Sequence, residues 1–209
     1  PTQTPNLARA LALGLIACCA AACGPELTEM GERKAAIVNG ELDEGHPSVG
    51  ALLSEGLCTA TLIGERAILT AAHCVSPGKV HTFVVAGRRI RVDKLTRHPD
   101  YINNPANIVN DIAVGRLRER PPVMPTPVGV GSPDVGQEVT LVGVGNTSNQ
   151  GGSGFKRKAI NLVWKKEAKK LSYRGAGGGA GNLCNGDSGG PTFTLLNGQD
   201  VQVGVHSYG

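Results

Sequence analysis

Short runs of β-forming residues, separated at close spacing by turn residues, limit what this chain can fold into more than any other feature. Such runs include SVGALL from residue 48, TATLI from residue 59 and TFVVAG from residue 82. Each is too short for a stable helix and is rich in residues that favour strands. The chain also contains 30 Gly and 13 Pro, which suit the turns between short strands. The pattern predicts an all-β protein with a sandwich or barrel architecture.

A proline-rich segment separates these runs into two groups. Residues 120–128, RPPVMPTPV, are incompatible with a central strand, because proline has no N–H to give to the ladder. Strand-like runs precede this segment as far as DIAVGRL at residues 111–117, and they resume with EVTLVGVG at residues 138–145. We therefore expect two all-β domains, residues 37–120 and residues 121–209.

The charge of the chain is mild, with a formal net value of +4 at pH 7. No stripe of Lys and Arg interleaved with aromatic residues occurs in the sequence, so nucleic acid is not an expected partner. One segment, FKRKAINLVWKKEAKK at residues 155–170, carries seven Lys or Arg and one Glu. Its composition favours a solvated strand edge, and a heparin or phosphate site is the alternative.

The N-terminal residues have the composition of an export signal. Arg9 precedes ALALGLIACCAAA, residues 10–22, an apolar run that is too short for a comfortable membrane span. We assign residues 1–23 to this export segment and the polar residues 24–36 to a pro-segment or linker. The protein is therefore expected to be secreted from a bacterial cell or anchored to its outside, in the periplasm or extracellular space.

Two cysteines of the export segment are candidates for a lipid anchor. LIAC, which ends at Cys18, resembles the box in which bacterial lipoproteins are acylated, and AAAC, which ends at Cys23, is a weaker match. Ordinary signal cleavage near the alanines, with no lipid attached, is the alternative. Either route brings the mature chain to a compartment where disulfides persist.

Three cysteines remain beyond the export segment: Cys58, Cys74 and Cys184. A disulfide between Cys58 and Cys74 would close the loop in front of His73, next to Cys74 in LTAAHCV. Zinc is the competing interpretation of Cys58, His73 and Cys74, but a fourth ligand is missing at any recognisable spacing. The odd cysteine implies a free thiol or an absent partner.

The stretch NGDSGGPTF holds Ser188 in a glycine-lined turn. A serine hydroxyl is a weak nucleophile unless a base takes its proton and a third group orients that base. His73 is the candidate base and Asp111, just before an apolar strand, is the candidate orienting group, with Asp100 as a rival carboxylate. Glycine lets the backbone approach a substrate carbonyl closely, so the N–H groups of Gly186 and Ser188 are candidate donors to an oxyanion.

The same stretch fits the G-x-S-x-G elbow of α/β-hydrolases, in which the acid and the histidine follow the serine. Here only Asp200 and His206 follow, both within a short tail, and no alternation of helices and strands precedes the serine. The sequence therefore gives little support to that fold.

Four motifs in a fixed order resemble the chymotrypsin/trypsin-like serine protease family. They are IVNG at 37–40, LTAAHC at 69–74, DIAVGRL at 111–117 and GDSGGP at 186–191. The resemblance covers residues 37–209 and implies the all-β fold of two six-stranded antiparallel β-barrels. The second barrel is expected to be incomplete, because the chain stops soon after the serine and looks C-terminally truncated.

The resemblance implies a serine endopeptidase that hydrolyses peptide bonds through an acyl-enzyme. His73 would be general base and then general acid, Asp111 would hold its tautomer, and Ser188 would attack the scissile carbonyl. The N–H groups of Gly186 and Ser188 would form the oxyanion hole. A catalytically silent relative that binds polypeptides is the alternative. We expect a monomer that acts on polypeptides and needs no metal or other cofactor.

The resemblance also implies a zymogen that is activated by cleavage before Ile37. The new α-ammonium group of Ile37 would turn inward and pair with Asp187, the residue before the serine.

Four residues match the substrate-binding positions of the family: Asn182, Ser207, Tyr208 and Gly209. Asn182 would lie at the floor of the primary pocket. It has no charge to pair with Lys or Arg, and a cationic side chain buried without a partner loses solvation at a high cost. We therefore expect the enzyme to prefer neutral side chains on the acyl side of the cut.

Overall fold

The computed structural model describes residues 37, 40–104, 107–146, 154–175 and 183–208. These residues form an all-β structure, as predicted, and their one helical segment is the short 3₁₀ turn η1 (Ala72–Cys74). Within the same ranges, no helix has the length and apolar character needed to cross a membrane. The predicted export segment and linker, residues 1–36, lie outside the described residues.

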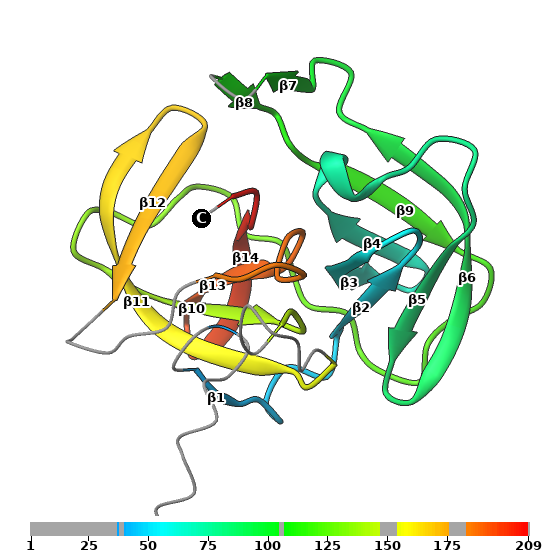
Figure 1. Cartoon of the computed structure of the whole chain (residues 1–209). Helices are drawn as coiled ribbons and strands as arrows, with labels where there is room; N and C mark the ends of the chain where they lie inside the picture. Colours follow the sequence, from blue (N-terminus) through cyan, green and yellow to red (C-terminus); the bar gives the residue numbers. More distant parts are fainter. Residues whose placement is uncertain (1–36, 38–39, 105–106, 147–153, 176–182, 209) are drawn as a thin grey trace, which may run out of the picture. The chain divides into compact units, whose positions relative to one another are not determined.

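The first half of the chain closes into an antiparallel barrel (Figure 1). The strand order around it is β2-β3-β4-β9-β6-β5, and β5 pairs with β2 to complete the circle. Closure pairs the edge strands that an open sheet would expose. The barrel strands are β2 (Val49–Leu53), β3 (Leu57–Gly64), β4 (Ala67–Thr70), β5 (His81–Val85), β6 (Arg88–Arg97) and β9 (Ala113–Leu117).

Large apolar side chains fill the interior of this barrel. Along β5 and β9 every second residue is buried, as expected when one face of a strand meets a core. Each large aliphatic or aromatic side chain that is fully buried stabilises the fold by about 1.5–3 kcal/mol. The largest are Leu52, Leu62, Ile68, Phe83, Ile90 and Leu117.

Five strands of the second half and β1, which comes from the start of the first half, form a six-stranded antiparallel sheet with the order β1-β11-β10-β13-β14, in which β12 also pairs with β11. The described strands make an open sheet, which is consistent with the expected incomplete barrel. Its core includes Val139, Leu141, Ala159 and Val163. The strands are β1 (Glu41–Leu42), β10 (Glu138–Gly143), β11 (Arg157–Glu167), β12 (Lys170–Gly175), β13 (Pro191–Leu196) and β14 (Gln199–Val205).

The basic segment at residues 155–170 is not a strand edge, so that prediction is wrong. Most of it is β11, which pairs with β10 on one side and with β1 and β12 on the other. Its last charged residues, Lys165 to Glu167, are exposed to solvent although the strand is paired on both sides, and several of its lysines have acidic partners. The pairs are Lys158–Glu41 at 3.2 Å, Lys165–Glu167 at 2.8 Å and Lys166–Asp134 at 2.9 Å.

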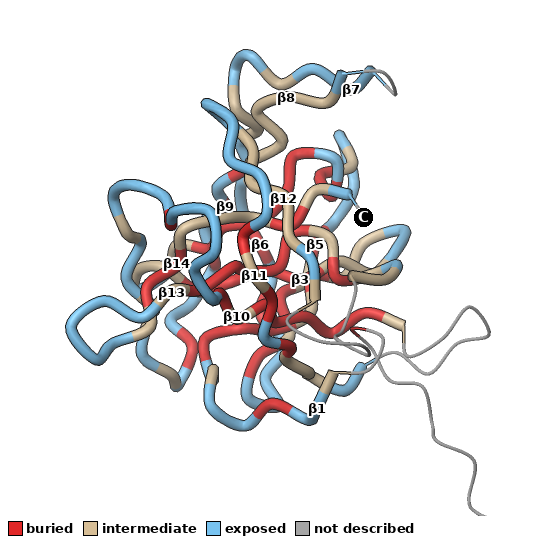
Figure 2. Tube along the Cα trace, turned by 90° about the vertical axis from the view of Figure 1, so that its left-hand side faces the viewer, coloured by how far each residue is buried: buried red, intermediate tan, exposed pale blue. Residues whose placement is uncertain are grey.

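The two halves meet through a small buried cluster in which Val49 of β2 packs with Val142 and Phe193 of the second sheet. The proline-rich connection is also attached, because Thr126 N–H donates to Leu62 O at 2.9 Å. Figure 2 shows buried residues concentrated on the central strands, whereas the hairpin β7 (Ile102–Asn104) and β8 (Asn107–Val109) is largely exposed.

Candidate active site

The pairing of two barrel strands brings His73 next to Asp111. Strands β4 and β9 are antiparallel, with Thr70 opposite Ala113. The chain leaves β4 into the turn η1, which holds His73, and Asp111 lies two residues before β9 begins. Two positions that are 38 residues apart in sequence therefore meet at one end of the barrel.

The carboxylate of Asp111 accepts three hydrogen bonds. His73 Nδ1 lies 2.7 Å from Oδ2, and the backbone N–H of His73 donates to Oδ1 at 2.8 Å. The hydroxyl of Ser207 donates to Oδ2 at 2.5 Å. Only 4% of the Asp111 side chain is exposed, against 31% for His73. A buried carboxylate thus supports an accessible imidazole.

These contacts set the charge state of Asp111. Burial by itself would raise the pKa of this carboxyl, but the hydrogen bonds from His73 and Ser207 outweigh it and hold the pKa below its ordinary value. An ionised Asp111 accepts a hydrogen bond from the N–H at Nδ1 of His73. Nε2 then carries no proton and is the basic nitrogen of the ring. The rival carboxylate, Asp100, is exposed.

A disulfide joins Cys58 of β3 to Cys74 of η1, as predicted. Both sulfurs are consumed in that bond, so the cluster of Cys58, His73 and Cys74 has no thiolate to offer zinc. The bridge fixes the turn that carries His73, whose Nε2 lies 3.7 Å from Cys74 Sγ. Cys184 is a free, half-buried cysteine.

The loop that carries Ser188 is attached to strand β3 of the first barrel. Thr59 N–H donates to Ser188 O at 2.8 Å, and Thr59 Oγ1 donates to Gly186 O at 2.9 Å. Gly189 follows with φ +82°, and a Cβ there would lie 2.2 Å from Thr70 Oγ1. The glycine after the serine is thus required both by backbone conformation and by the close approach of the barrel.

The backbone of this loop leaves two N–H groups unused. Asp187 N–H donates to Cys184 O at 3.0 Å, and Gly189 N–H donates to His206 O at 2.8 Å. The N–H groups of Gly186 and Ser188 make no hydrogen bond to any residue that the structure describes. They are therefore free to bind an acceptor from outside the chain.

Asp187 is completely buried beside Ile37, which is also completely buried. Its carboxylate accepts backbone N–H bonds from Gly145 at 2.8 Å, Cys184 at 2.9 Å and Ile37 at 3.4 Å. Burial raises the pKa of Asp187 by more than these three hydrogen bonds lower it. The carboxylate therefore occupies a site in which no described cation compensates its charge.

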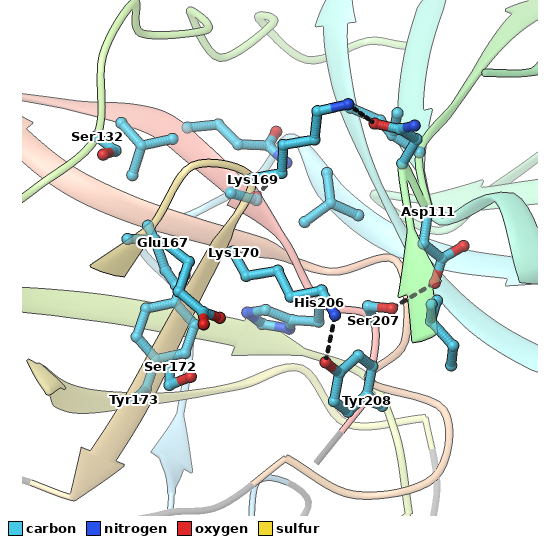
Figure 3. A pocket seen from close by; sticks show the side chains of 18 of the residues that line it. Asp111, Ser132, Glu167, Lys169, Lys170, Ser172, Tyr173, His206, Ser207 and Tyr208 are labelled. Carbon is cyan, nitrogen blue, oxygen red and sulfur yellow. Dashed lines mark hydrogen bonds between the residues drawn. The ribbon is translucent and has the colours of Figure 1, made fainter. Parts of the chain in front are cut away.

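A cavity of about 390 Å³ opens beside Ser188. The Ser188 loop lines one side, and His206, Ser207 and Tyr208 line the other. A larger cavity shares these three residues. Figure 3 shows that the Ser207 side chain points toward Asp111 and the Tyr208 side chain toward Lys170. Of the predicted substrate-binding residues, Ser207 and Tyr208 thus lie together at the site. Asn182 and Gly209 lie outside the described residues.

The chain matches the family model described as Trypsin over residues 37–209. It belongs to the trypsin family. Among curated proteins, it is 30% identical to phenoloxidase-activating factor 1 of Holotrichia diomphalia, over 73% of this chain and 54% of that protein. It is also 30% identical to trypsin 5G1 of Aedes aegypti, over 78% of this chain and 69% of that protein.

A solved structure of neuropsin, a serine protease expressed in the limbic system of mouse brain, has a TM-score of 0.64 to this chain. The two are 26% identical, and the match covers 78% of this chain and 82% of that one. The chain spans about half to two thirds of the length of the first curated relatives that it matches. Those two relatives are insect proteins, so the comparisons give no support to a bacterial origin in particular.

Some features of this trypsin-family site were not evident from the sequence. The sequence places Gly145 only at the end of a strand-like run, yet a Cβ there would lie 2.7 Å from Asp187 Oδ1. The sequence offers His206 only as part of an α/β-hydrolase triad, yet it lines the cavity beside Ser188. A histidine within a strand-like run gives no local sign that its ring is buried.

Proposed function

We propose that this member of the trypsin family is a serine endopeptidase that uses Ser188, His73 and Asp111. Ser188 Oγ attacks the scissile carbonyl while His73 Nε2 takes its proton, so that the C–O bond forms as the hydroxyl O–H breaks. The proton then passes to the leaving amine, and water repeats the sequence to release the acyl group. Asp111 stabilises the imidazolium that forms in each step.

The unused N–H groups of Gly186 and Ser188 support an oxyanion hole. The carbonyl oxygen of the substrate gains negative charge in the tetrahedral intermediate, and two fixed N–H donors stabilise that charge. Removing one such donor from an oxyanion hole typically lowers kcat by about 10²–10³-fold. Because both donors belong to the loop held by Thr59, they are oriented before the substrate arrives.

Activation by cleavage before Ile37 is supported by the position of the Ile37 nitrogen, 3.4 Å from Asp187 Oδ2. Cleavage would convert this amide into an α-ammonium group beside a buried carboxylate. At 4 Å and an effective dielectric of about 20, two unit charges attract by about 4 kcal/mol before desolvation. That is enough to fix the loop that carries Ser188.

The observation that carries the proposal is the buried Asp111 carboxylate 2.7 Å from His73 Nδ1, which also accepts a hydrogen bond from Ser207, a residue that lines the cavity beside Ser188. Covalent labelling by a fluorophosphonate probe tests it directly. We expect the processed protein to be labelled at Ser188, and both Ser188→Ala and His73→Ala to remain unlabelled. Equal labelling of the His73 variant would contradict the assignment.

A catalytically silent, polypeptide-binding protein is the second candidate. It is favoured by one observation: both residues are described, yet no hydrogen bond joins His73 Nε2 to Ser188 Oγ. Hydrogen bonds of a catalytic site are often long before substrate binds, so the endopeptidase remains the better account. A silent protein would bind a peptide without labelling by the probe and without releasing product.

Export and anchoring are also proposals, because residues 1–23 lie outside the described residues. We propose that this segment directs the chain out of a bacterial cell, with Cys18 or Cys23 as the acylated residue, and that the mature protein is a monomer. Metabolic labelling with a fatty-acid analogue tests the anchor. Label that survives Cys18→Ala but not Cys23→Ala would assign the lipid to Cys23.

A further inference from the structure

We propose that Lys156 and Arg157, the first two basic residues of the segment at 155–170, position the N-terminus that cleavage before Ile37 creates. We call these two side chains the clamp. They hold the residues that follow Ile37 against strand β11, so that the new α-ammonium group stays beside Asp187. They act through Ile37 and Asp187 and are therefore positioning residues. This inference rests on the proposed endopeptidase function and names residues that control the order of its site.

The segment that follows Ile37 runs along the start of β11. Leu42 of β1 lies opposite Arg157 of β11 in an antiparallel pair (Figure 1). Beyond β1, Asp43 N–H donates to Lys156 O at 2.9 Å. Strand β1 has only two residues, so its ladder contains few backbone hydrogen bonds. Contacts made by side chains therefore contribute much of what holds this segment in place.

Arg157 is connected to the future N-terminus by a series of hydrogen bonds. Its Nη1 donates to Gly40 O at 3.0 Å, and Gly40 N–H donates in turn to Ile37 O. The nitrogen of Ile37 lies 3.4 Å from Asp187 Oδ2. A hydrogen bond from an ionised donor is roughly twice as strong as a neutral one. By holding the carbonyl of Gly40, the guanidinium group thus fixes the turn that carries Ile37.

The turn is also packed closely against the strand. A Cβ on Gly40 would lie 2.8 Å from Lys158 O and 2.9 Å from Ile37 O, distances that leave no space for a side chain. The side chain of Ile37 is completely buried in one cluster with Ala159 and Val163 of β11. The same strand therefore supplies both the apolar site for Ile37 and the cation that holds the residues after it.

Lys156 fixes the far end of the same segment. Its ammonium group lies 3.6 Å from Asp43 Oδ2 and donates a hydrogen bond to His46 O. The side chain of Asp43 has no exposed surface, and its Oδ1 lies 2.7 Å from His46 Nδ1. A buried carboxylate is costly unless cations and hydrogen bonds compensate it. Lys156 therefore stabilises the conformation in which the segment after Ile37 lies on β11.

The third consecutive basic residue, Lys158, is not part of the clamp. It pairs with Glu41 at 3.2 Å, but 71% of the Glu41 side chain is exposed. Such surface ion pairs contribute little, because water weakens the attraction and both side chains lose conformational freedom. Lys158 lies on the same strand and carries the same charge as its two neighbours, so it is a matched control.

The pH dependence of activity should report the position of Ile37. The ion pair with Asp187 needs a protonated α-amino group, and free α-amino groups lose that proton near about pH 8. Pairing favours the protonated form, so the activity of the cleaved protein should persist above that pH and be lost as pH rises further. A clamp weakened by about 10-fold should move this loss down by about one pH unit.

The test compares the cleaved wild-type protein with Arg157→Met and Lys156→Met, which remove the charge and keep much of the aliphatic stem. In both variants, kcat for a peptide substrate between about pH 7 and about pH 10 should fall about one pH unit earlier. Acetylation of the Ile37 α-amine by acetic anhydride, followed by mass spectrometry, should be about 10-fold faster. Lys158→Met should change neither quantity, and Arg157→Lys should recover part of both.

Two further measurements separate positioning from a general loss of structure. Urea unfolding shows which variants fold, and if Arg157→Met does not, Arg157→Gln takes its place with the same expected results. In Asp187→Asn the ammonium group has no charged partner, so adding Arg157→Met should not speed acetylation further. A further increase of about 10-fold there would reveal general loosening and overturn the clamp.

The remaining outcomes distinguish the clamp from the endopeptidase. If the fluorophosphonate probe labels Ser188 of the cleaved wild-type protein, but both variants keep its pH profile and acetylation rate, the clamp is wrong and the endopeptidase stands. If the cleaved wild-type protein is not labelled and cleaves no peptide, both proposals fail.

Discussion

The backbone nitrogen of Ile37 lies 3.4 Å from Oδ2 of Asp187, although the two residues are 150 positions apart. Asp187 is the residue next to Ser188, and its carboxylate is buried. The contact therefore connects the start of the family match directly to the loop of the candidate nucleophile.

Cleavage before Ile37 should raise the stability of the protein. The pKa of Asp187 is raised by burial in the uncleaved chain, so its ionised form disfavours folding as pH rises through that pKa. An α-ammonium group on Ile37 would instead stabilise the ionised carboxylate of Asp187 and so favour the folded state. We expect the cleaved form to be about 2–4 kcal/mol more stable to urea at pH 7. Asp187→Asn should abolish the difference, and Asp100→Asn, an exposed control, should preserve it.

Ser188→Ala and His73→Ala should each abolish peptide hydrolysis to the same extent. The two side chains act as one unit, so each loss should reach about 10⁴-fold or more in kcat, and the double variant should be no worse. Hydrolysis of a fluorogenic peptide measures this. His98→Ala, in the loop before β7, should retain activity; residual turnover in His73→Ala far above that of Ser188→Ala would contradict the pairing.

The disulfide between Cys58 and Cys74 should contribute about 3 kcal/mol to stability, as expected for a loop with a sequence separation of 16. Cys58→Ala, Cys74→Ala and the double variant should therefore lose similar amounts in urea unfolding. Peptide hydrolysis should fall as well, because the bridge fixes the turn of His73. Cys184→Ala is the control, and a comparable loss there would assign the effect to something other than the bridge.

Asp43 should make the protein acid-sensitive. Burial alone would raise its pKa, but His46 at 2.7 Å and Lys156 at 3.6 Å hold the pKa below its ordinary value. Its contribution is therefore present above the unfolded pKa of about 3.9 and is lost as pH falls through the folded pKa. Asp43→Asn should lower stability by about 3 kcal/mol at pH 7. In urea titrations that difference should shrink below about pH 4, and a constant difference would contradict the linkage.

Much of the first barrel was predictable, because apolar and polar residues alternate along several of its strands. Strand β5, within TFVVAG, and strand β9, within DIAVGRL, have buried residues at every second position. The short strands β1, β7 and β8 were not predicted, because their residues have no such period. The basic strand β11 was wrongly predicted to be an edge. Its side chains from Lys165 to Glu167 are exposed, but the strand still pairs on both sides, because strand pairing uses backbone groups and not side chains.

The candidate residues His73 and Ser188 could be selected from the sequence because each lies in a short, specific motif. The site was not predictable where long-range packing decides the role. Burial of His206 depends on the backbone of Gly190, and the need for glycine at position 145 depends on Asp187. These contacts join segments that are distant in the sequence, and neither local sequence indicates that the other segment lies beside it.

Thr59 makes the position of the Ser188 loop depend on the first barrel. One strand of the first half binds both Gly186 O and Ser188 O of the second half. Under the proposed function, hydrolysis therefore depends on both halves being folded and in contact with each other.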